Sequence, residues 1–200
     1  MYSESVGVET GASSEARGSL ILASASPRRR KILEACGLSF RVVVPEVEEV
    51  HWHGDPEGTV TENAARKCRW ACERYPLVTV IAADTVVVFN GESIGKPKSY
   101  DEAVTMLEQF SGCSQMVYTG VAMGISDQPL QQSTTKSRVH FRELNSSDIE
   151  AYFRRVDPLD KAGGYDIDQH SDLIIRDYEG SWTNIMGLPR AIVEAWLTCK

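Results

Sequence analysis

Short apolar runs alternate along this chain with segments in which apolar residues recur at helical spacing. The first such group predicts a strand at Leu20–Ala23, a helix over about 26–36 and a second strand at 40–44. Ser26 is a suitable N-cap for this helix, and Pro27 suits its first position. These residues therefore predict a strand–helix–strand unit.

Two longer helices are predicted in the middle of the chain. Thr59 and Glu62 have the spacing of a capping box, for a helix that reaches about residue 75. Ser99 and Glu102 repeat this spacing before an apolar stripe that ends at 111–112. Such a stripe is typical of a helix packed on a core rather than of a functional site.

The other predicted strands require antiparallel as well as parallel pairing. Two β-rich runs at 115–125 and 130–141 predict a long antiparallel pair, and the turn signal Asn90–Gly91 predicts a hairpin. The remaining predicted elements are a buried strand at 77–82, hairpin strands at 86–89 and 92–94, a short helix near 147–154, a glycine-containing loop at 160–165, a strand at 173–176 and a last helix at 188–197. We therefore expect an α/β fold with a mixed sheet.

Length and composition favour a compact soluble protein. The 200 residues with 42% hydrophobic content predict one domain at 19–200, and the small, polar residues 1–18 predict a flexible N-terminal tail. This tail lacks the apolar run of a secretory signal, and no apolar stretch in the chain has the length of a membrane span. Five scattered cysteines argue against a disulfide framework, so we expect a cytoplasmic protein.

Four consecutive cations, Arg28 to Lys31, lie in the first turn of the first predicted helix. They are mildly destabilising there, because a helix N-terminus already carries partial positive charge. An anionic ligand would reverse this effect, since free N–H and guanidinium groups would face one point that suits a phosphate. The alternative is a solvated basic helix face. Because the net charge of −7 disfavours binding to a nucleic-acid polymer, any anion site has to be local.

Acidic residues follow two of the predicted strands. Asp84 in A-A-D-T comes where the strand at 77–82 is expected to end, a position at which ligands gather in α/β folds, or it caps a turn. Glu49 lies in an acidic loop after the second strand, and its carboxylate suits Mg²⁺ or Mn²⁺, although such loops are usually just solvated. Lys96 in G-K-P either neutralises a phosphate or lies in an exposed turn. Together these residues supply the parts of metal-assisted phosphate chemistry.

Seven short motifs occur in order along the chain. They are S-A-S-P-R-R at 24–29, E-V-E-E at 46–49, A-A-D-T at 82–85, G-K-P at 95–97, S-G at 111–112, D-K-A-G-G-Y at 160–165 and N-I-M-G-L-P at 184–189. In this order, over roughly residues 20–197, they resemble the Maf-like nucleotide pyrophosphatases. The resemblance implies a two-lobed α/β fold with a long twisted mixed sheet flanked by helices, similar to that of the inosine-triphosphatase family, with a nucleotide in the central cleft.

The resemblance also implies a reaction and roles for individual residues. The family splits nucleoside triphosphates into a monophosphate and pyrophosphate with a divalent cation, Mg²⁺ or Mn²⁺. By position, Asp84 matches the proton acceptor, and Lys96 and Arg28 match phosphate-contacting cations. The other matches are Lys67 on the helix before the strand, Glu49 and Asp84 as metal ligands, and Ser24, Ser26 and Lys161 as substrate contacts.

Three residues concern the choice of substrate. Arg29 and Thr85 resemble the branch of the family that acts on dTTP and UTP. Asp168, however, stands where that branch has a glutamine. Since an ionised carboxylate only accepts hydrogen bonds and an amide also donates them, recognition of the base could differ. A modified nucleotide such as 7-methyl-GTP is therefore the alternative substrate.

The reaction hypothesis is in-line attack of water on the α-phosphorus, with pyrophosphate as leaving group and Asp84 orienting or deprotonating the water. An unperturbed Asp has a pKa of about 3.9, so burial or a metal has to contribute. A different class of function is a nucleotide-binding regulator of cell division that keeps the pocket without catalysis. By resemblance, the protein is compatible with a homodimer.

Overall fold

A computed structural model describes residues 20–198 of the chain, and the tail predicted at 1–18 lies outside the described residues. Its strands form one seven-stranded sheet in the order β2-β1-β3-β5-β6-β7, with β4 paired to β3. β1 pairs in parallel with β2 and β3, and the other pairs are antiparallel. The strands are β1 (Leu20–Ala23), β2 (Phe40–Val43), β3 (Thr79–Phe89), β4 (Glu92–Ser93), β5 (Ser114–Gly124), β6 (Gln131–Phe141) and β7 (Ile175–Glu179). This confirms the predicted mixed sheet and the long antiparallel pair β5–β6.

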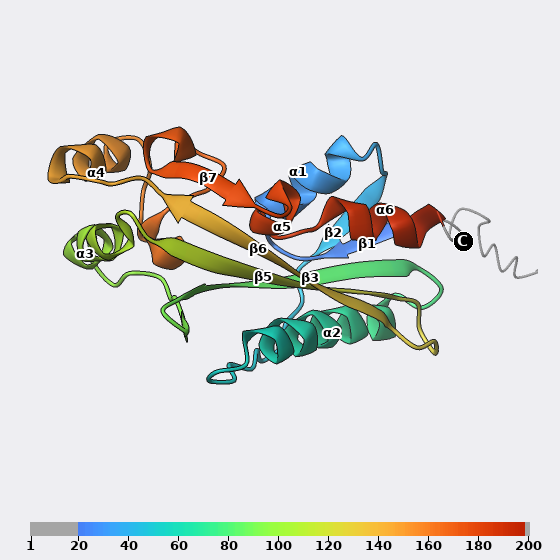
Figure 1. Ribbon diagram of the computed structural model, residues 1–200. Coiled ribbons are helices and arrows are strands. Elements are labelled where there is room, and N and C mark those ends of the chain that lie inside the picture. The colour runs from blue at the N-terminus through green and yellow to red at the C-terminus, as the bar shows by residue number, and fades with distance from the viewer. Residues whose placement is uncertain (1–19, 199–200) are drawn as a thin grey trace, which may run out of the picture.

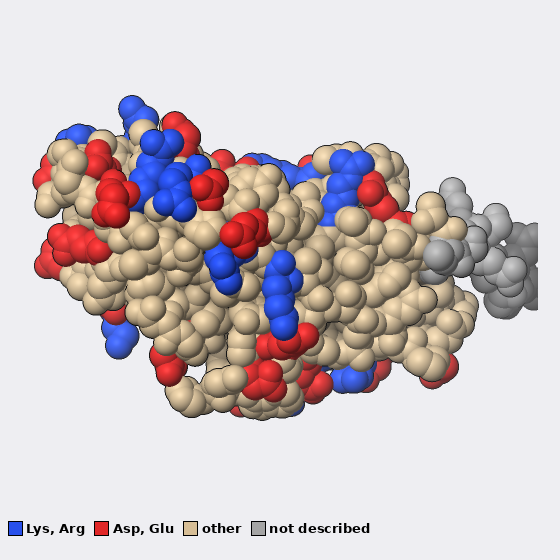
Figure 2. Space-filling view, in the orientation of Figure 1, with Lys and Arg blue, Asp and Glu red and all other residues tan. Residues whose placement is uncertain are grey.

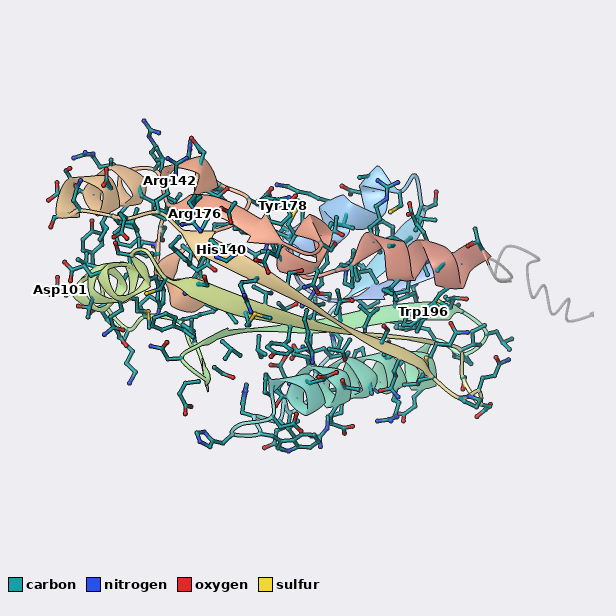
Figure 3. All side chains as sticks on the ribbon, in the orientation of Figure 1. Asp101, His140, Arg142, Arg176, Tyr178 and Trp196 are labelled. Carbon is teal, nitrogen blue, oxygen red and sulfur yellow. The ribbon has the colours of Figure 1, made fainter. Side chains whose placement is uncertain are left out.

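Helices cover both faces of the sheet (Figure 1). α2 lies alone on one face, and α1, α5 and α6 lie on the other. α3 and α4 lie at the end of the sheet where β5 begins and β6 ends. Asp101 on α3 and Trp196 on α6 mark opposite ends of the molecule (Figure 3). The helices are α1 (Pro27–Ala35), α2 (Pro56–Arg74), α3 (Tyr100–Phe110), α4 (Ser146–Phe153), α5 (Trp182–Ile185) and α6 (Arg190–Thr198), with short 3₁₀ turns at Ala162–Gly164 and Ser171–Leu173. None of the described helices is long and apolar enough to cross a membrane.

The sheet separates two apolar cores, and β1 shows how the sequence supplies both. Leu20 and Leu22 pack in the core beneath α1, α3, α4 and α6, whereas Ile21 and Ala23 pack in the core beneath α2. Successive side chains of a strand point to opposite faces, so a strand covered on both sides needs a continuous apolar run. The uninterrupted L-I-L-A sequence is therefore the signature of a central, doubly covered strand.

β3 is a single long strand, whereas the sequence predicted a strand that ends at 82 and a separate hairpin strand at 86–89. β5 pairs with β3 without a break from Val80 to Val88. The polar dipeptide Asp84–Thr85 suggested the break, but both side chains have polar partners within the fold. The prediction that Asp84 follows the end of a strand is therefore wrong. The predicted turn at Asn90–Gly91 is confirmed, and both of its residues have positive φ.

The start of α2 also differs from the prediction. Asp55 is the N-cap, its carboxylate accepts from the N–H of Gly58 at 2.8 Å, and Pro56 takes the first helical position. Thr59 does not cap the helix, because its hydroxyl donates to the carbonyl of Asp55 and accepts from the N–H of Trp52. α2 therefore begins four residues earlier than the proposed capping box required.

The second predicted capping box is only half present. Ser99 caps α3 by accepting from the N–H of Glu102, but the Glu102 carboxylate accepts from the N–H of Lys98 rather than from that of Ser99. A complete capping box occurs instead at α4, between Asn145 and Asp148. The sequence predicted α4 itself but not α5, which has only four residues.

Tyr152 fixes the loop that follows α4. The fully buried hydroxyl accepts from the N–H of Asp166 at 2.8 Å and donates to its carbonyl at 3.3 Å. Tyr152→Phe leaves both groups unpaired, so we expect a loss of about 1–3 kcal/mol in the free energy of unfolding. Urea denaturation measures this change. The control is Tyr178→Phe, whose exposed ring packs on Trp182, and equal midpoints for the two variants would contradict the prediction.

Candidate active site

One stretch of β3 lacks a neighbouring strand on the side of β1. β1 pairs with β3 only as far as Ala23 and Ala82, and β4 pairs with it only at Val88 and Phe89. Among the described strands, none pairs with 83–87 on this side. The turn after β1 and the N-terminus of α1 follow directly from Ala23. The carboxyl end of β1 therefore opens beside the middle of β3, which is where a ligand is expected in an open α/β sheet.

A cavity of about 210 Å³ lies at this opening. The residues that line it come from α1, β3, β5 and the loops around 161–167 and 185–187, and they are Ser26, Arg28, Arg29, Thr85, Val87, Val117, Lys161, Ala162, Tyr165, Ile167, Ile185, Met186 and Gly187. Three of these residues are cationic and none is acidic. The face of the molecule in Figure 2 instead carries Lys and Arg side by side with Asp and Glu. The cavity is therefore a local positive region on a chain of net charge −7.

Arg28 is held at the cavity and keeps free hydrogen-bonding capacity. Its Nη1 contacts Asp166 Oδ1 at 3.1 Å, while its buried Nε has no partner within the described structure. A buried donor without a partner costs free energy, which an acceptor on a ligand would recover. Arg28 therefore suits a phosphate, as the sequence resemblance implied.

Arg29 has a different environment from Arg28, although the two residues are adjacent in the sequence. Its Nε donates to the carbonyl of Gly187 at 2.8 Å, its Nη1 to Ser24 Oγ at 3.1 Å and its Nη2 to Thr85 Oγ1 at 3.0 Å. Burial lowers the pKa of Arg29, and the charge of Asp84 opposes this shift. Arg29 thus connects β1, β3 and the 184–187 loop rather than extending into solvent.

The Arg29 contacts continue into a chain of hydroxyl groups. Thr85 Oγ1 accepts from Arg29 and lies 3.0 Å from Thr119 Oγ1, which in turn donates to the carbonyl of Asn184 at 3.0 Å. The direction of this chain is fixed, because a guanidinium only donates and a carbonyl only accepts. Gly187 belongs to the same loop with a φ of 99°, and a Cβ there would approach Thr85 Oγ1 to 3.1 Å. The loop therefore packs tightly on β3.

The two serines lie where β1 leads into α1. Ser26 lines the cavity and caps α1, accepting from the N–H of Arg29 at 3.4 Å. Ser24 is buried, and its Oγ accepts from the N–H of Ser26 and from Arg29. The predicted N-cap is confirmed, and the start of α1 faces the cavity as an anion site requires.

A second group of charged residues lies beneath α2. Lys67 Nζ contacts Asp84 Oδ1 at 2.7 Å and Glu49 Oε1 at 2.6 Å, so two carboxylates converge on one ammonium group. The side chains of Lys67 and Asp84 are 11% and 10% exposed, and that of Glu49 is 42% exposed. Only Glu49 is therefore substantially open to solvent. The sequence assigned these three residues to one site, and the structure brings them together.

The carboxylate group and the cavity lie on opposite faces of β3. Val80 and Ala82 face α2, as does Asp84, whereas Thr85 faces Arg29 and the cavity. The charges of Asp84 and Glu49 nevertheless act on Arg29, whose charged form they favour. Since β3 has no neighbour over 83–87 within the described sheet, the two groups are close at this edge.

Two predicted site residues, Lys96 and Asp168, lie outside both groups, and Lys161 lines the cavity but pairs elsewhere. Lys96 is exposed and makes no hydrogen bond or ion pair with another described site residue. The hydrogen bond from Lys161 lowers the pKa of Asp160, and the charge of Lys96 adds to this shift. Lys161 lines the cavity, but its Nζ contacts Asp160 and the carbonyl of Asp157. Asp168 Oδ2 contacts Lys31 Nζ at 2.7 Å and is not part of the cavity wall.

The position of Asp168 leads to a prediction for substrate choice. Asp168→Gln removes the ion pair with the exposed Lys31, and surface pairs of this kind contribute little because water screens them. We therefore expect the ratio of kcat/KM values between nucleotides to change by less than about fivefold. Steady-state kinetics with dTTP, UTP and 7-methyl-GTP measures it. A larger change would show that Asp168 takes part in recognition of the base.

The carboxylate group fits a divalent cation. Mg²⁺ is usually bound through one or two carboxylates together with phosphate oxygens of the substrate and water. Among the described residues, no group of three or more His, Cys, Asp or Glu side chains could hold a metal ion. Glu49 and Asp84 converge on Lys67 as a pair of carboxylates. That both already converge on the positive charge of Lys67 shows that the position favours a cation.

Several residues of the site were not found from the sequence. Asn63, Thr119 and Asp166 are buried polar residues that hold Asp84, Thr85 and Arg28, respectively. Each lies far along the chain from its partner, so no local spacing indicates the contact. Only a polar residue within an otherwise apolar stripe, such as Asn63 before the two alanines at 64–65, could have drawn attention to them.

Solved structures of low sequence identity share the fold. The HAM1 protein from Coxiella burnetii superposes with a TM-score of 0.53 at 16% identity, over 91% of this chain and 99% of that one. The Ham1 protein of Staphylococcus aureus gives a TM-score of 0.51 at 16% identity, over 89% and 99% of the two chains. The fold class is thus the inosine-triphosphatase-like α/β fold expected from the sequence.

Sequence comparison narrows this class to one family. The family described as Maf-like protein matches residues 19–199. A dTTP/UTP pyrophosphatase of Thermotoga maritima is 40% identical over 180 residues, which cover 89% of this chain and 87% of that protein. A second one, from Symbiobacterium thermophilum, is 42% identical over 171 residues, which cover 85% and 88% of the two chains. The chain belongs to the Maf family.

Proposed function

We propose that this protein hydrolyses nucleoside triphosphates, dTTP and UTP foremost, to a nucleoside monophosphate and pyrophosphate. The observation that carries the proposal is a cation-lined cavity at the open edge of β3, next to the converging carboxylates of Asp84 and Glu49. Its relatives named dTTP/UTP pyrophosphatase support the choice of substrates. A role in removing unwanted nucleotides from the pool follows from this chemistry.

Some residues of the site would neutralise the charge of the phosphates, and another would accept the proton. Arg28 and the N-terminus of α1 would bind the polyphosphate, and Lys96 is assigned to it by resemblance alone. Asp84 would accept a proton as water attacks the α-phosphorus, and the P–O bond to pyrophosphate breaks on the opposite side. Lys67 holds Asp84 Oδ1 and so keeps this carboxylate oriented.

Glu49 and Asp84 are the residues that would hold a divalent cation, Mg²⁺ or Mn²⁺. When bound, such an ion neutralises phosphate charge and makes water a stronger acid. Lys67 then has a second effect, because its positive charge keeps the two carboxylates from repelling each other before the ion arrives. This arrangement accounts for a lysine between two predicted metal ligands.

The test is pyrophosphate release from a panel of canonical and modified nucleoside triphosphates with Mg²⁺ or Mn²⁺. Release from dTTP and UTP supports the proposal. Release confined to modified nucleotides such as 7-methyl-GTP would instead identify them as the substrates, which is the alternative that Asp168 suggested. Nucleotide binding without any release would identify a non-catalytic regulator. Sedimentation of the same preparation tests the homodimer expected by resemblance, and cell fractionation tests the cytoplasmic location.

A further inference from the structure

Asn63 is a fully buried amide on α2 that makes three hydrogen bonds. Its Oδ1 accepts from the N–H of Val50 at 2.8 Å, and its Nδ2 donates to the carbonyl of Val50 at 3.0 Å and to Asp84 Oδ2 at 3.1 Å. Of these two partners, only Asp84 was assigned to the site from the sequence. The side chain therefore contacts both the acidic loop and the proposed base.

The orientation of this amide is determined by its partners. A backbone N–H can only donate, and a carbonyl or an ionised carboxylate can only accept. Turning the amide by 180° would place Oδ1 against the Val50 carbonyl and the Asp84 carboxylate, so all three contacts would become repulsive. The observed orientation is therefore the one compatible with this environment, and the donor to Asp84 is the amide nitrogen.

The contacts of Asn63 connect two parts of the chain that carry the candidate metal ligands. Val50 directly follows Glu49, in a loop without helix or strand structure. Asp84 lies on β3, and Lys67 lies one helical turn after Asn63 on the same side of α2. Asn63 and Lys67 thus each contact one oxygen of Asp84 and each hold the Glu49 segment, one through the backbone and one through the side chain.

Two other hydrogen bonds to this loop are either exposed or farther along the chain from Glu49 than those of Asn63. Arg66 Nη1 donates to the carbonyl of Glu48 at 3.1 Å in an exposed position, and Thr59 Oγ1 accepts from the N–H of Trp52. Hydrogen bonds in buried positions are stronger than exposed ones, because water does not compete for the same groups. Asn63 is therefore the contact best placed to fix Glu49 relative to Asp84.

We propose that Asn63 is a positioning residue, which joins the Glu49 loop to Asp84 so that both carboxylates converge on one point before a nucleotide binds. The inference rests on the proposed function, since it assigns the convergence to the binding of a divalent cation. Outer hydrogen bonds to metal-ligating carboxylates characteristically affect metal affinity and turnover by about 10–100-fold. A merely structural asparagine would affect stability without this selective effect.

The first experiment compares Asn63→Ser with the wild type. We expect kcat to fall by about 10–100-fold, with the KM for the nucleotide little changed. The dissociation constant of Mn²⁺ alone, measured without nucleotide by the electron paramagnetic resonance signal of free Mn²⁺, should rise by a similar factor of about 10–100. The matched control is Thr61→Val, which removes a hydrogen bond between α2 and Thr134 on β6, away from the carboxylates.

A second measurement needs no substitution. Hydrogen exchange of the Val50 amide in the wild-type protein, followed by NMR, reports whether the bond to Asn63 exists without ligand. We expect this amide to be protected in the absence of metal and nucleotide. An amide that becomes protected only when Mn²⁺ and nucleotide are added would overturn the proposal, whatever the stability of the Asn63→Ser variant.

The outcomes separate this inference from the proposed function. Unchanged kcat and unchanged Mn²⁺ affinity in Asn63→Ser would show that Asn63 does not position the carboxylates. Equal losses in Asn63→Ser and Thr61→Val would show a general effect on α2 and would also refute the proposal. If the wild type releases no pyrophosphate, the proposed function fails, but Mn²⁺ affinity and Val50 exchange still decide whether Asn63 organises this site.

Discussion

Asp84→Asn is expected to lower kcat by about 10²–10⁴-fold, the contribution typical of a positioned general base. The substitution keeps the size of the side chain and can still accept from Lys67, but it removes the negative charge and the proton-accepting oxygen. Binding of the nucleotide should largely persist, because Arg28 and the start of α1 lie on the other face of β3. The expected result is thus a loss of turnover in a protein that still binds.

Single-turnover pyrophosphate release and calorimetric titration with the monophosphate product measure these two effects separately. The matched control is Asp177→Asn, which neutralises an exposed strand carboxylate on β7 that pairs with Arg176. Turnover retained in Asp84→Asn would refute the assignment of Asp84 as base. Loss of binding together with turnover would instead show that Asp84 acts mainly by holding the site together.

Arg29→Lys is expected to be the most destabilising of the conservative changes at the site. Arg29 makes three charge-assisted hydrogen bonds in different directions, to Gly187, Ser24 and Thr85. A lysine ammonium cannot reproduce the planar guanidinium that makes them. If two of the three bonds are lost, at about 1.5–3 kcal/mol each, the free energy of unfolding falls by roughly 3–6 kcal/mol.

The matched control is the neighbouring Arg30→Lys. Arg30 is exposed and pairs with Glu34 one helical turn away, so a lysine can replace it with little effect on stability. Guanidinium chloride denaturation of both variants at one temperature gives the comparison. Equal midpoints for Arg29→Lys and Arg30→Lys would show that the connection from α1 to the 184–187 loop contributes nothing to stability.

The contrast among the adjacent arginines shows what the sequence could and could not predict. The run Arg28 to Lys31 after Pro27 correctly predicted a helix start with an unfavourable cluster of cations. Three neighbouring residues nevertheless have three environments. Arg28 pairs with Asp166 at the cavity, half-buried Arg29 is bonded to β3 and the 184–187 loop, and Arg30 is in solvent. Successive residues of a helix point in different directions, which separates these side chains. Which of them is bonded within the fold depends on where β3 and the 184–187 loop lie, and the sequence does not show this.

The strands also show what could and could not be predicted from the sequence. Apolar or β-rich runs predicted β1, β2, β5 and β6 within one or two residues, because strand-forming residues between turn signals leave a clear pattern. The pattern failed at β3, where Asp84 and Thr85 interrupt the apolar run without interrupting the strand. Their partners, Lys67, Asn63 and Arg29, lie elsewhere in the chain. A polar dipeptide in the middle of a buried strand is thus interpreted from the sequence as the end of that strand.

The opposite orientation of Asp84 and Thr85 also restricts how this protein can change in length. Asp84 pairs with Gly120 and Thr85 with Thr119, and a Cβ at Gly120 would collide with the backbone of Val60 on α2. A one-residue insertion in β3 would exchange the faces of every later side chain, and would turn the acid toward the arginines and the hydroxyl toward Lys67. Insertions and deletions should therefore accumulate in loops such as 126–130 and be rare in β3. Circular permutants and domain insertions at 126–130 are the engineered forms that this geometry permits.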